Sequence, residues 1–315
     1  MIGAPAAVPA PAGRSSSLAR ALRGGGLARR ERRLAIALLV PSFVGLVAVM
    51  GYPTVQTILW SFEHADVLNP QSGYTFSNYT GLWHDPVFWA ALRFTVIYAA
   101  MSVAGQMLLG LGIAVMANRE FRGRWLFRAL LIFPWMMPTV ITAVVWQFMY
   151  DPNYGLFDAV LQRAGLPHSF VFLGSSKLAI FSLLMLAIWK VNSFAALVFL
   201  AGMQGISPEL YEAAEIDGAA AWQRFRRVTL PMLKPTILVV LVLRTVEALQ
   251  AFDIIYGLTG GGPGGATQNL PMYLYQQGIL GLNFGYGSAV GVVLAVIIAA
   301  FAVLYLKVLY QPSVE

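Results

Sequence analysis

Charged and amide side chains interrupt two strongly apolar segments of the chain. Lys190 and Asn192 lie within one segment, and Glu247 and Gln250 lie within another. An ionised side chain in such surroundings is costly and is usually paired or functional. Groups that bond hydroxyls, beside a flat aromatic ring such as Trp189, would suit a polyhydroxylated ligand. We therefore interpret these residues as candidates for the lining of a substrate path.

Two further ionisable residues leave the chemistry of this region open. Arg244 stands three positions before Glu247, so the two side chains can pair on one helix face. Asp253 is also a candidate for the substrate path. It is nine positions from Arg244, about half a turn around by the helical period, so it is expected to point away from that pair. An equal alternative is that the polar groups hold helices together, with Lys190 or Arg244 neutralising Glu247. A third hypothesis is an ion-coupled secondary transporter that uses Glu247 and Asp253.

The composition indicates that these groups lie within a membrane protein. The chain has 315 residues, of which 58% are hydrophobic and only 11% are charged. That leaves too little polar surface to cover a soluble globule. Six apolar segments are long enough to cross a bilayer as helices. They are Leu34 to Trp60, Trp89 to Ala117, Leu126 to Tyr150, Leu178 to Met203, Thr236 to Tyr256 and Phe284 to Leu309.

Two prolines fall within the third of these segments. Pro134 and Pro138 each remove a backbone donor and can kink a helix. Such a kink would either permit a rocking motion or be a fixed packing feature, since proline is common in membrane helices.

The distribution of positive charge predicts the orientation. Most of the 21 Lys and Arg residues lie before the first segment, between the second and third, between the fourth and fifth, or at the end of the sixth. Positive residues concentrate on the cytoplasmic side, so both termini are predicted to be cytoplasmic. The net charge of +7 is then explained by topology, and nucleic-acid binding need not be invoked.

The chain ends are predicted to lie outside the membrane domain of residues 34–310. Residues 1–33 are rich in Ala, Pro, Gly, Ser and Arg, which favours a disordered basic tail, and residues 311–315 form a short C-terminal tail. A signal peptide is the alternative for the first apolar segment. That segment runs on too long and lacks a convincing small-residue cleavage site.

The residue types give no indication of catalysis or of a bound cofactor. The chain has no Cys, which excludes disulfides and thiol chemistry, and its three His residues are scattered without ligand spacing. Gly260 to Gly265 formally fits a dinucleotide fingerprint, but it follows an apolar helix instead of a strand. We predict no catalytic residue, no metal site and no cofactor bound by this chain.

The loop between the fourth and fifth apolar segments, residues 207–235, predicts a helical elbow. Ser207 and Pro208 suit the first positions of a helix. Gly218 can take the left-handed conformation that ends a helix, and residues 219–228 can form a second one.

The second half of the elbow combines aromatic and basic residues. Trp222 and Phe225 share a helix face, surrounded by arginines. This pattern suits a groove on a partner protein, or alternatively an amphipathic helix lying on anionic lipid.

The ordered residues of the elbow resemble the conserved cytoplasmic loop of bacterial ABC importer permeases. The residues that carry the resemblance are Glu212, Ala213, Ala214, Asp217, Gly218, Phe225, Leu230, Pro231 and Pro235. The stretch Thr259 to Pro263 is similar to the carbohydrate branch, in particular to the first permease of the maltose and glycerol-3-phosphate systems. Importers of amino acids, peptides or metals share the elbow but usually not this second stretch. The resemblance runs from about Arg29 to Tyr310.

The resemblance implies an all-α polytopic fold of six transmembrane helices, of the type I ABC importer permease, in the bacterial cytoplasmic membrane. It further implies a second six-helix permease, two ATPase subunits that bind ATP and Mg, and an extracytoplasmic substrate-binding protein docking on loops such as 61–88 and 257–283. In such an assembly Glu212 would dock the elbow on an ATPase, Gly218 would allow its bend, and Trp222 with Phe225 would fill a groove there.

Overall fold

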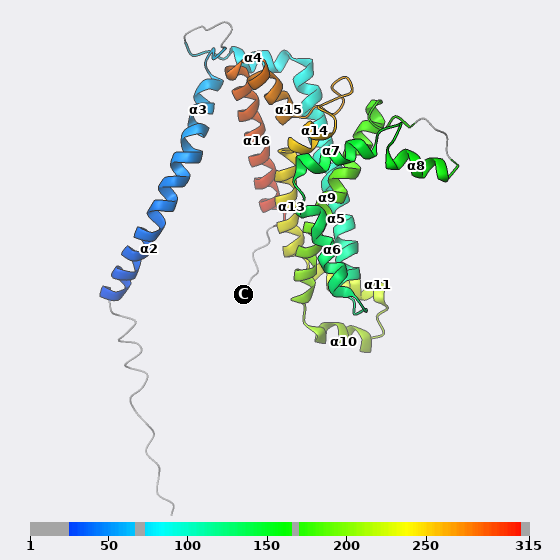
Figure 1. The fold of residues 1–315 in the computed structure, drawn as a ribbon. Helices are drawn as coiled ribbons and strands as arrows, with labels where there is room; N and C mark the ends of the chain where they lie inside the picture. The colour runs from blue at the N-terminus through cyan, green and yellow to red at the C-terminus, as the bar shows by residue number, and fades with distance from the viewer. Residues whose placement is uncertain (1–24, 67–72, 166–169, 310–315) are drawn as a thin grey trace, which may run out of the picture. The chain divides into compact units, whose positions relative to one another are not determined.

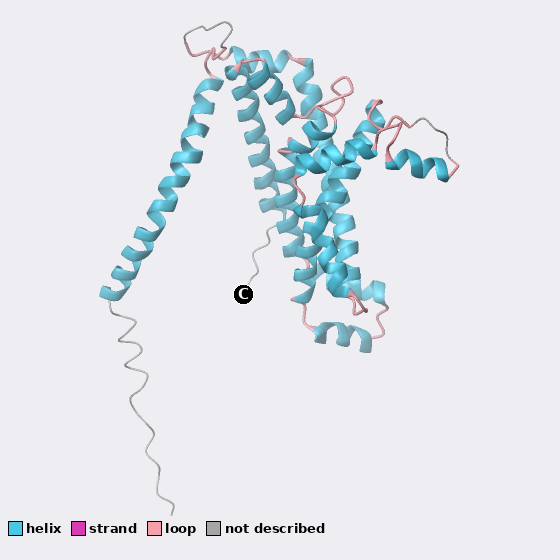
Figure 2. Ribbon diagram, in the orientation of Figure 1, coloured by secondary structure: helices cyan, strands magenta, loops and turns pink. Residues whose placement is uncertain are grey.

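The computed structural model describes residues 25–66, 73–165 and 170–309, and it confirms the all-α class. Helices account for the regular structure of these residues, joined by loops and by the isolated bridges Glu63–Tyr74 and Asp66–Asn283 (Figure 2). The predicted C-terminal tail lies outside the described residues, as does most of the N-terminal one.

The chain divides into two compact units, residues 1–56 and 57–315. The helical elements, in order, are α2 (Gly25–Leu46), the π-helical turn η1 (Val47–Gly51), α3 (Tyr52–Ser61), α4 (Ser77–His84), α5 (Pro86–Asn118), α6 (Arg124–Met136), α7 (Thr139–Met149), α8 (Leu156–Arg163), α9 (Ser176–Gln204), α10 (Pro208–Ile216), α11 (Ala221–Arg224), η2 (Phe225–Thr229), α12 (Leu230–Met232), α13 (Lys234–Leu249), α14 (Asp253–Leu258), α15 (Leu270–Leu274), η3 (Tyr275–Leu280) and α16 (Phe284–Leu309) (Figure 1).

The first helix begins earlier than the sequence predicted. Helix α2 starts at Gly25, so the prediction of a disordered tail through residue 33 is wrong for its last nine residues. Leucine, alanine, arginine and glutamate, which favour helix, dominate this stretch and extend the apolar helix backwards. Residues Arg33–Ser61 are long and apolar enough to cross a membrane.

Four of the six predicted membrane segments are continuous and two are broken. Arg33–Ser61, Pro86–Asn118, Ser176–Gln204 and Phe284–Lys307 are unbroken helices of sufficient length. The third segment consists of α6 and α7, bent by 95° at the two residues before Thr139. The fifth segment ends as a helix at Leu249 and resumes at Asp253. The expectation that the prolines can kink the third segment is therefore confirmed, whereas the expectation of one continuous helix in the fifth segment is wrong.

Helices α5 and α9 form the centre of the second unit and run side by side (Figure 1). Small residues let them approach closely. A Cβ atom added at Gly110 of α5 would lie 2.8 Å from the Cβ of Ala195 and 3.2 Å from the backbone nitrogen of Ala196. Van der Waals packing of small residues is a main source of helix association in lipid. This contact positions the polar residues of both helices relative to each other.

Opposite the elbow end of this unit, a polar cluster joins three helices. Asp85 caps α5 by accepting a hydrogen bond from the Val87 amide at 2.8 Å. Its second carboxylate oxygen accepts from the hydroxyl of Tyr273, on α15, and from that of Tyr286, on α16. Burial tends to raise the pKa of Asp85, but these hydrogen bonds outweigh it and the pKa is lowered.

Gly110 provides a test of the α5–α9 contact. Gly110→Leu is expected to lower the Tm of the detergent-solubilised protein, because the Ala196 backbone cannot yield and overpacking costs about 1–3 kcal/mol. Gly112→Leu is the matched control, since a Cβ atom at Gly112 meets nothing within 4 Å. Differential scanning fluorimetry of both variants measures the difference. Equal Tm values for the two variants would contradict this account of the packing.

Candidate functional site

A cavity of about 310 Å³ lies between α5, α9 and the broken helix α13–α14. Several of the predicted path residues share its wall, namely Lys190, Glu247, Gln250 and Asp253, together with Arg244. The remaining lining residues are Tyr98, Ser102, Gln106, Thr139, Ala187, Val191, Ala248, Ala251, Phe252 and Ile254. The fold therefore brings predicted residues from two distant segments to one site.

Arg244 and Glu247 form the predicted pair. The guanidinium lies 2.5 Å from the Glu247 carboxylate, and its Nε donates to the amide oxygen of Gln106 at 3.2 Å. It also lies over the Phe194 ring, 5.6 Å from the centroid. Arg244 is buried, whereas the Glu247 side chain is 57% exposed. The buried cation is thus neutralised and hydrogen-bonded, while the carboxylate keeps a face toward the cavity.

Asp253 faces the same cavity as Glu247, which corrects the expectation that it points elsewhere. The expectation assumed an unbroken helix, but the chain leaves helical geometry between Leu249 and Asp253. The buried Asn269 donates its side-chain amide to the Ala251 carbonyl at 2.5 Å and so satisfies a backbone group that the break leaves free.

Lys190 is buried at the second helix break. Its ammonium donates to the Met137 carbonyl at 2.6 Å and lies 3.5 Å from the Pro134 carbonyl. Among the described residues no carboxylate lies within 4.0 Å of it. The structure therefore contradicts the suggestion that Lys190 neutralises Glu247, because the lysine ammonium bonds main-chain carbonyls instead.

Trp189 and Asn192 are not part of the cavity lining. The Trp189 ring packs on Trp146 of α7, with centroids 5.2 Å apart. Asn192 donates its side-chain amide to the Trp189 carbonyl one turn earlier, at 3.2 Å. Both lie on other faces of α9 than Lys190, so the structure does not bring these two predicted path residues to the cavity.

The sequence prediction missed a polar face of α5. Tyr98, Ser102 and Gln106 recur every four residues and line the cavity opposite α13. That spacing places them on one helix face and was a readable signal. It was missed because none of the three residues carries a formal charge.

An aromatic group adjoins the cavity at the break between α13 and α14. The ring of Phe252, a lining residue, stacks on Tyr256 with centroids 5.3 Å apart and contacts Tyr275 at 5.1 Å. Tyr256 is half exposed. The flat aromatic surface expected near the polar groups is therefore provided by these residues instead of Trp189.

The elbow has the two arms that the sequence predicted. Helix α10 begins at Pro208, and Gly218 turns the chain with a left-handed φ of 76°. The second helical stretch starts at Ala221 and continues beyond the expected Val228 through Leu230 and Pro231 of α12. Exposed residues of the first arm and its turn include Glu212, Ala213, Asp217 and Gly218, whereas Ala214 is half-buried.

Side-chain contacts fix the two arms together. Arg224 of α11 lies 2.5 Å from the Glu215 carboxylate of α10. The Tyr211 hydroxyl, also on α10, lies 3.0 Å from that of Thr229. The elbow is thus held as one folded piece.

The aromatic pair of the elbow lies beside α5. The rings of Trp222 and Phe225 stack with centroids 5.5 Å apart. They line a pocket of about 410 Å³ with the last turns of α5, from Leu108 to Arg119. Trp222 is 68% exposed, so one side of its ring is free.

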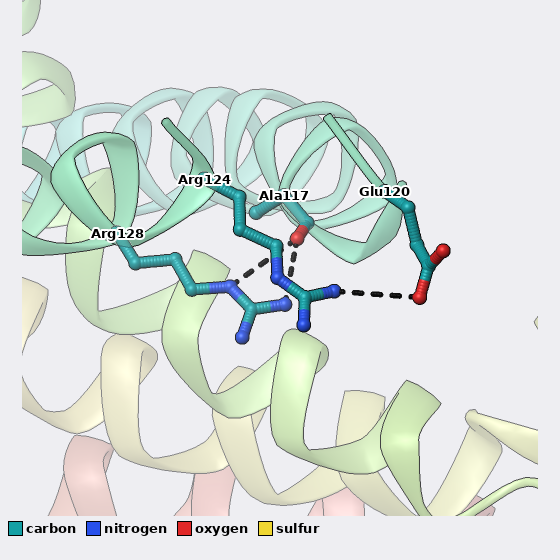
Figure 3. A network of polar contacts seen from close by, with 4 residues as sticks. All are labelled: Ala117, Glu120, Arg124 and Arg128. Carbon is teal, nitrogen blue, oxygen red and sulfur yellow. Dashed lines mark hydrogen bonds and ion pairs between the residues drawn. The ribbon is translucent and has the colours of Figure 1, made fainter. Parts of the chain in front are cut away.

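Arginine side chains cap the C-terminal end of α5 near the elbow. Arg128 of α6 donates from both Nε and Nη2 to the Ala117 carbonyl, at 3.3 and 2.9 Å, and Arg124 lies 3.7 Å from Glu120 (Figure 3). A cation at a helix C-terminus satisfies its free carbonyls and opposes the negative end of its dipole. The turn between α5 and α6 is therefore held in place next to the elbow.

Comparison with known proteins identifies the family. Residues 106–314 match the family described as binding-protein-dependent transport system inner membrane component. The chain is 38% identical to the sulfoquinovosyl glycerol transport system permease protein SmoG of Agrobacterium fabrum, over 89% of this chain and 91% of that protein. It is 38% identical to the trehalose/maltose transport system permease protein MalF of Thermococcus litoralis, over 89% and 94%.

Solved structures support the same fold. A chain from a bacterial ABC transporter involved in the import of the acidic polysaccharide alginate superposes with a TM-score of 0.77 at 25% identity, covering 89% of this chain and 97% of that one. These comparisons give no support to the ion-coupled transporter suggested from Glu247 and Asp253. The chain belongs to the family of inner membrane components of binding-protein-dependent transport systems and is a permease subunit of an ABC importer.

Proposed function

We propose that this permease carries a carbohydrate or related polyol into the cytoplasm through the cavity between α5, α9 and α13–α14. The observation that carries the proposal is the lining itself, where Glu247, Gln250 and Asp253 present hydrogen-bonding groups close to Phe252. Sugars are bound by such combinations of polar groups and flat rings. Relatives named for sulfoquinovosyl glycerol, trehalose/maltose and sn-glycerol-3-phosphate support a hydroxyl-rich substrate.

The cavity charges favour an uncharged substrate, because both cations of the lining are already occupied. Arg244 is neutralised by Glu247, and Lys190 is turned toward main-chain carbonyls. The remaining polar lining offers acceptors, such as the carboxylates of Glu247 and Asp253, and donors, such as the amide of Gln250, and a hydroxyl group can pair with either kind.

The proposed assembly pairs this chain with a second six-helix permease, two cytosolic ABC ATPases and an extracytoplasmic substrate-binding protein. ATP and Mg would be bound by the ATPases, so this chain is not itself an enzyme. The family's description as binding-protein-dependent supports the last of these partners.

The elbow is proposed as the contact with an ATPase. Its first arm and turn expose Glu212 and Gly218, while Trp222 and Phe225 line a pocket with α5. The first arm would dock on the ATPase. The aromatic pair, at the pocket that it shares with α5, would transmit the movement of the docked arm to α5. Its basic surroundings support a cytoplasmic location for the elbow, and the same charge rule supports cytoplasmic chain termini.

Affinity purification tests this assembly. The tagged chain is purified from its host in mild detergent, and bound proteins are identified by mass spectrometry while the eluate is assayed for MgATPase activity. We expect a second permease, an ATPase and a binding protein, which is then screened against sugars and polyols. A chain that is recovered alone, without ATPase activity, would contradict the proposal.

Substitutions in the elbow should uncouple transport from ATP hydrolysis. Glu212→Lys reverses the charge of the docking arm, and Gly218→Pro removes the amide that bonds the Glu215 carbonyl at 2.9 Å and forbids a φ of 76°. Each should reduce uptake of the sugar bound by the purified binding protein by roughly tenfold or more while leaving the chain in the membrane. Glu209→Lys is the control, because it reverses another exposed charge on α10. Its uptake should stay closer to that of the parent protein than the uptake of Glu212→Lys.

Substitutions of Glu247 distinguish a role of this residue in transport from a purely structural role. Glu247→Gln keeps a hydrogen-bond acceptor beside Arg244, whereas Glu247→Ala leaves the buried guanidinium without its partner. If the carboxylate faces substrate, Glu247→Gln should alter the KM of uptake with normal recovery of the complex. Normal uptake kinetics in Glu247→Gln, with loss of assembly only in Glu247→Ala, would assign the residue to helix packing.

A further inference from the structure

The break between α6 and α7 leaves backbone carbonyls without helical partners. Pro138 has no N–H, so the Pro134 carbonyl four residues earlier has no donor from the helix. Helix α6 ends at Met136, and Met137 is extended with ψ 136°, so its carbonyl also lies outside the ladder. An unsatisfied backbone group that is buried in the protein is strongly unfavourable, because water cannot reach it to replace the missing donor.

Lys190 supplies the missing donors. Its ammonium bonds the Met137 carbonyl at 2.6 Å and reaches that of Pro134 at 3.5 Å, from a side chain only 5% exposed. These carbonyls, 53 and 56 residues away in sequence, are its hydrogen-bond acceptors among the described residues.

Neighbouring residues of α9 contact both sides of the same break. Phe194 packs on Trp135 of α6 with centroids 5.8 Å apart, and Trp189 packs on Trp146 of α7 at 5.2 Å. The lysine thus lies between two aromatic contacts, one on each helix of the bent pair.

The direction of α7 determines part of the cavity wall. Thr139, the first residue of α7, lines the cavity. One turn later α7 packs on α14, where a Cβ atom at Gly257 would lie only 2.8 Å from that of Ala143. Helix α14 begins with Asp253, another lining residue. The bend is therefore linked by direct packing to two positions on the wall.

We propose that Lys190 is a positioning residue: it holds the α6–α7 bend by hydrogen-bonding the carbonyls that the break leaves free, and thereby shapes the cavity without binding the substrate through its charge. The proposal depends on the proposed function only in treating the cavity as the import path.

Spin labels on the bent pair measure this role directly. The chain has no Cys, so in an importer whose partner subunits have had their Cys residues replaced, the label attaches only to Leu130→Cys on α6 and Phe148→Cys on α7, both exposed in the isolated chain. Double electron–electron resonance on the purified importer in lipid nanodiscs then gives the distance between the two helices. Lys190→Met, which keeps the length but removes the donors, should shift and broaden the distance distribution. Lys190→Arg, which keeps the donors, should restore it.

Lys177→Met is the matched control, because it removes an exposed lysine from the same helix and should leave the distances unchanged. A Lys190→Met distribution equal to that of the parent protein would overturn the proposal. So would equal shifts in Lys190→Met and Lys190→Arg, since arginine keeps both the donors and the charge, and the shape of the lysine side chain would then be decisive.

A second measurement covers the case in which Lys190→Met does not survive purification. In native membranes, a Thr139→Cys variant is treated with a water-soluble maleimide, and the rate of reaction is compared with and without Lys190→Met. A changed rate that Lys190→Arg reverses supports the proposal, and an unchanged rate overturns it. Neither measurement uses a transported compound, so both remain valid if the carbohydrate proposal fails.

Discussion

The structure depends on satisfying the backbone wherever an apolar helix is interrupted. In lipid, water does not supply the missing partners, so a broken helix is tolerated only if other parts of the protein provide them. Lys190 provides donors at the α6–α7 break, and Asn269 provides one at the α13–α14 break. Both side chains are buried and come from distant segments. The breaks are therefore built into the tertiary structure and are not local irregularities of two helices.

These two breaks add polar groups to the cavity. An unbroken fifth segment would turn Asp253 away from Glu247, and an unbroken third would remove Thr139 from the wall. Because the chain bends at both places, backbone and side-chain polar groups from several helices meet at one site. Neutralisation of Arg244 by Glu247 and Gln106 lets a buried cation remain there without an uncompensated charge.

Local signals were sufficient for the elements and for the proline kink of the third segment, but not for the interruption of the fifth. Composition and periodicity predicted the apolar segments and the elbow, because burial in lipid and glycine turns depend on residues close in sequence. The Arg244–Glu247 pair followed from spacing within one helix. The break after Leu249 could not be predicted, because the partner that stabilises it, Asn269, lies beyond a glycine-rich loop. Similarly, Trp189 was assigned to the cavity although its ring packs on α7, a contact that only the tertiary structure reveals.

The elbow shows how a force applied at the surface could reach the cavity. Its arms are cross-linked by Arg224–Glu215 and by Tyr211–Thr229, so a push on α10 moves the whole piece. Tyr211 and Val228 of that piece pack against the cluster that contains Ala114 and Ala117 of α5, and Arg128 secures this end of α5 to α6. Helix α5 carries Tyr98, Ser102 and Gln106 on the cavity wall, and α6 ends at the bend that Lys190 holds. Rigid helices joined at two fixed breaks can transmit displacement as a change in cavity shape, which is what alternating access requires of a permease.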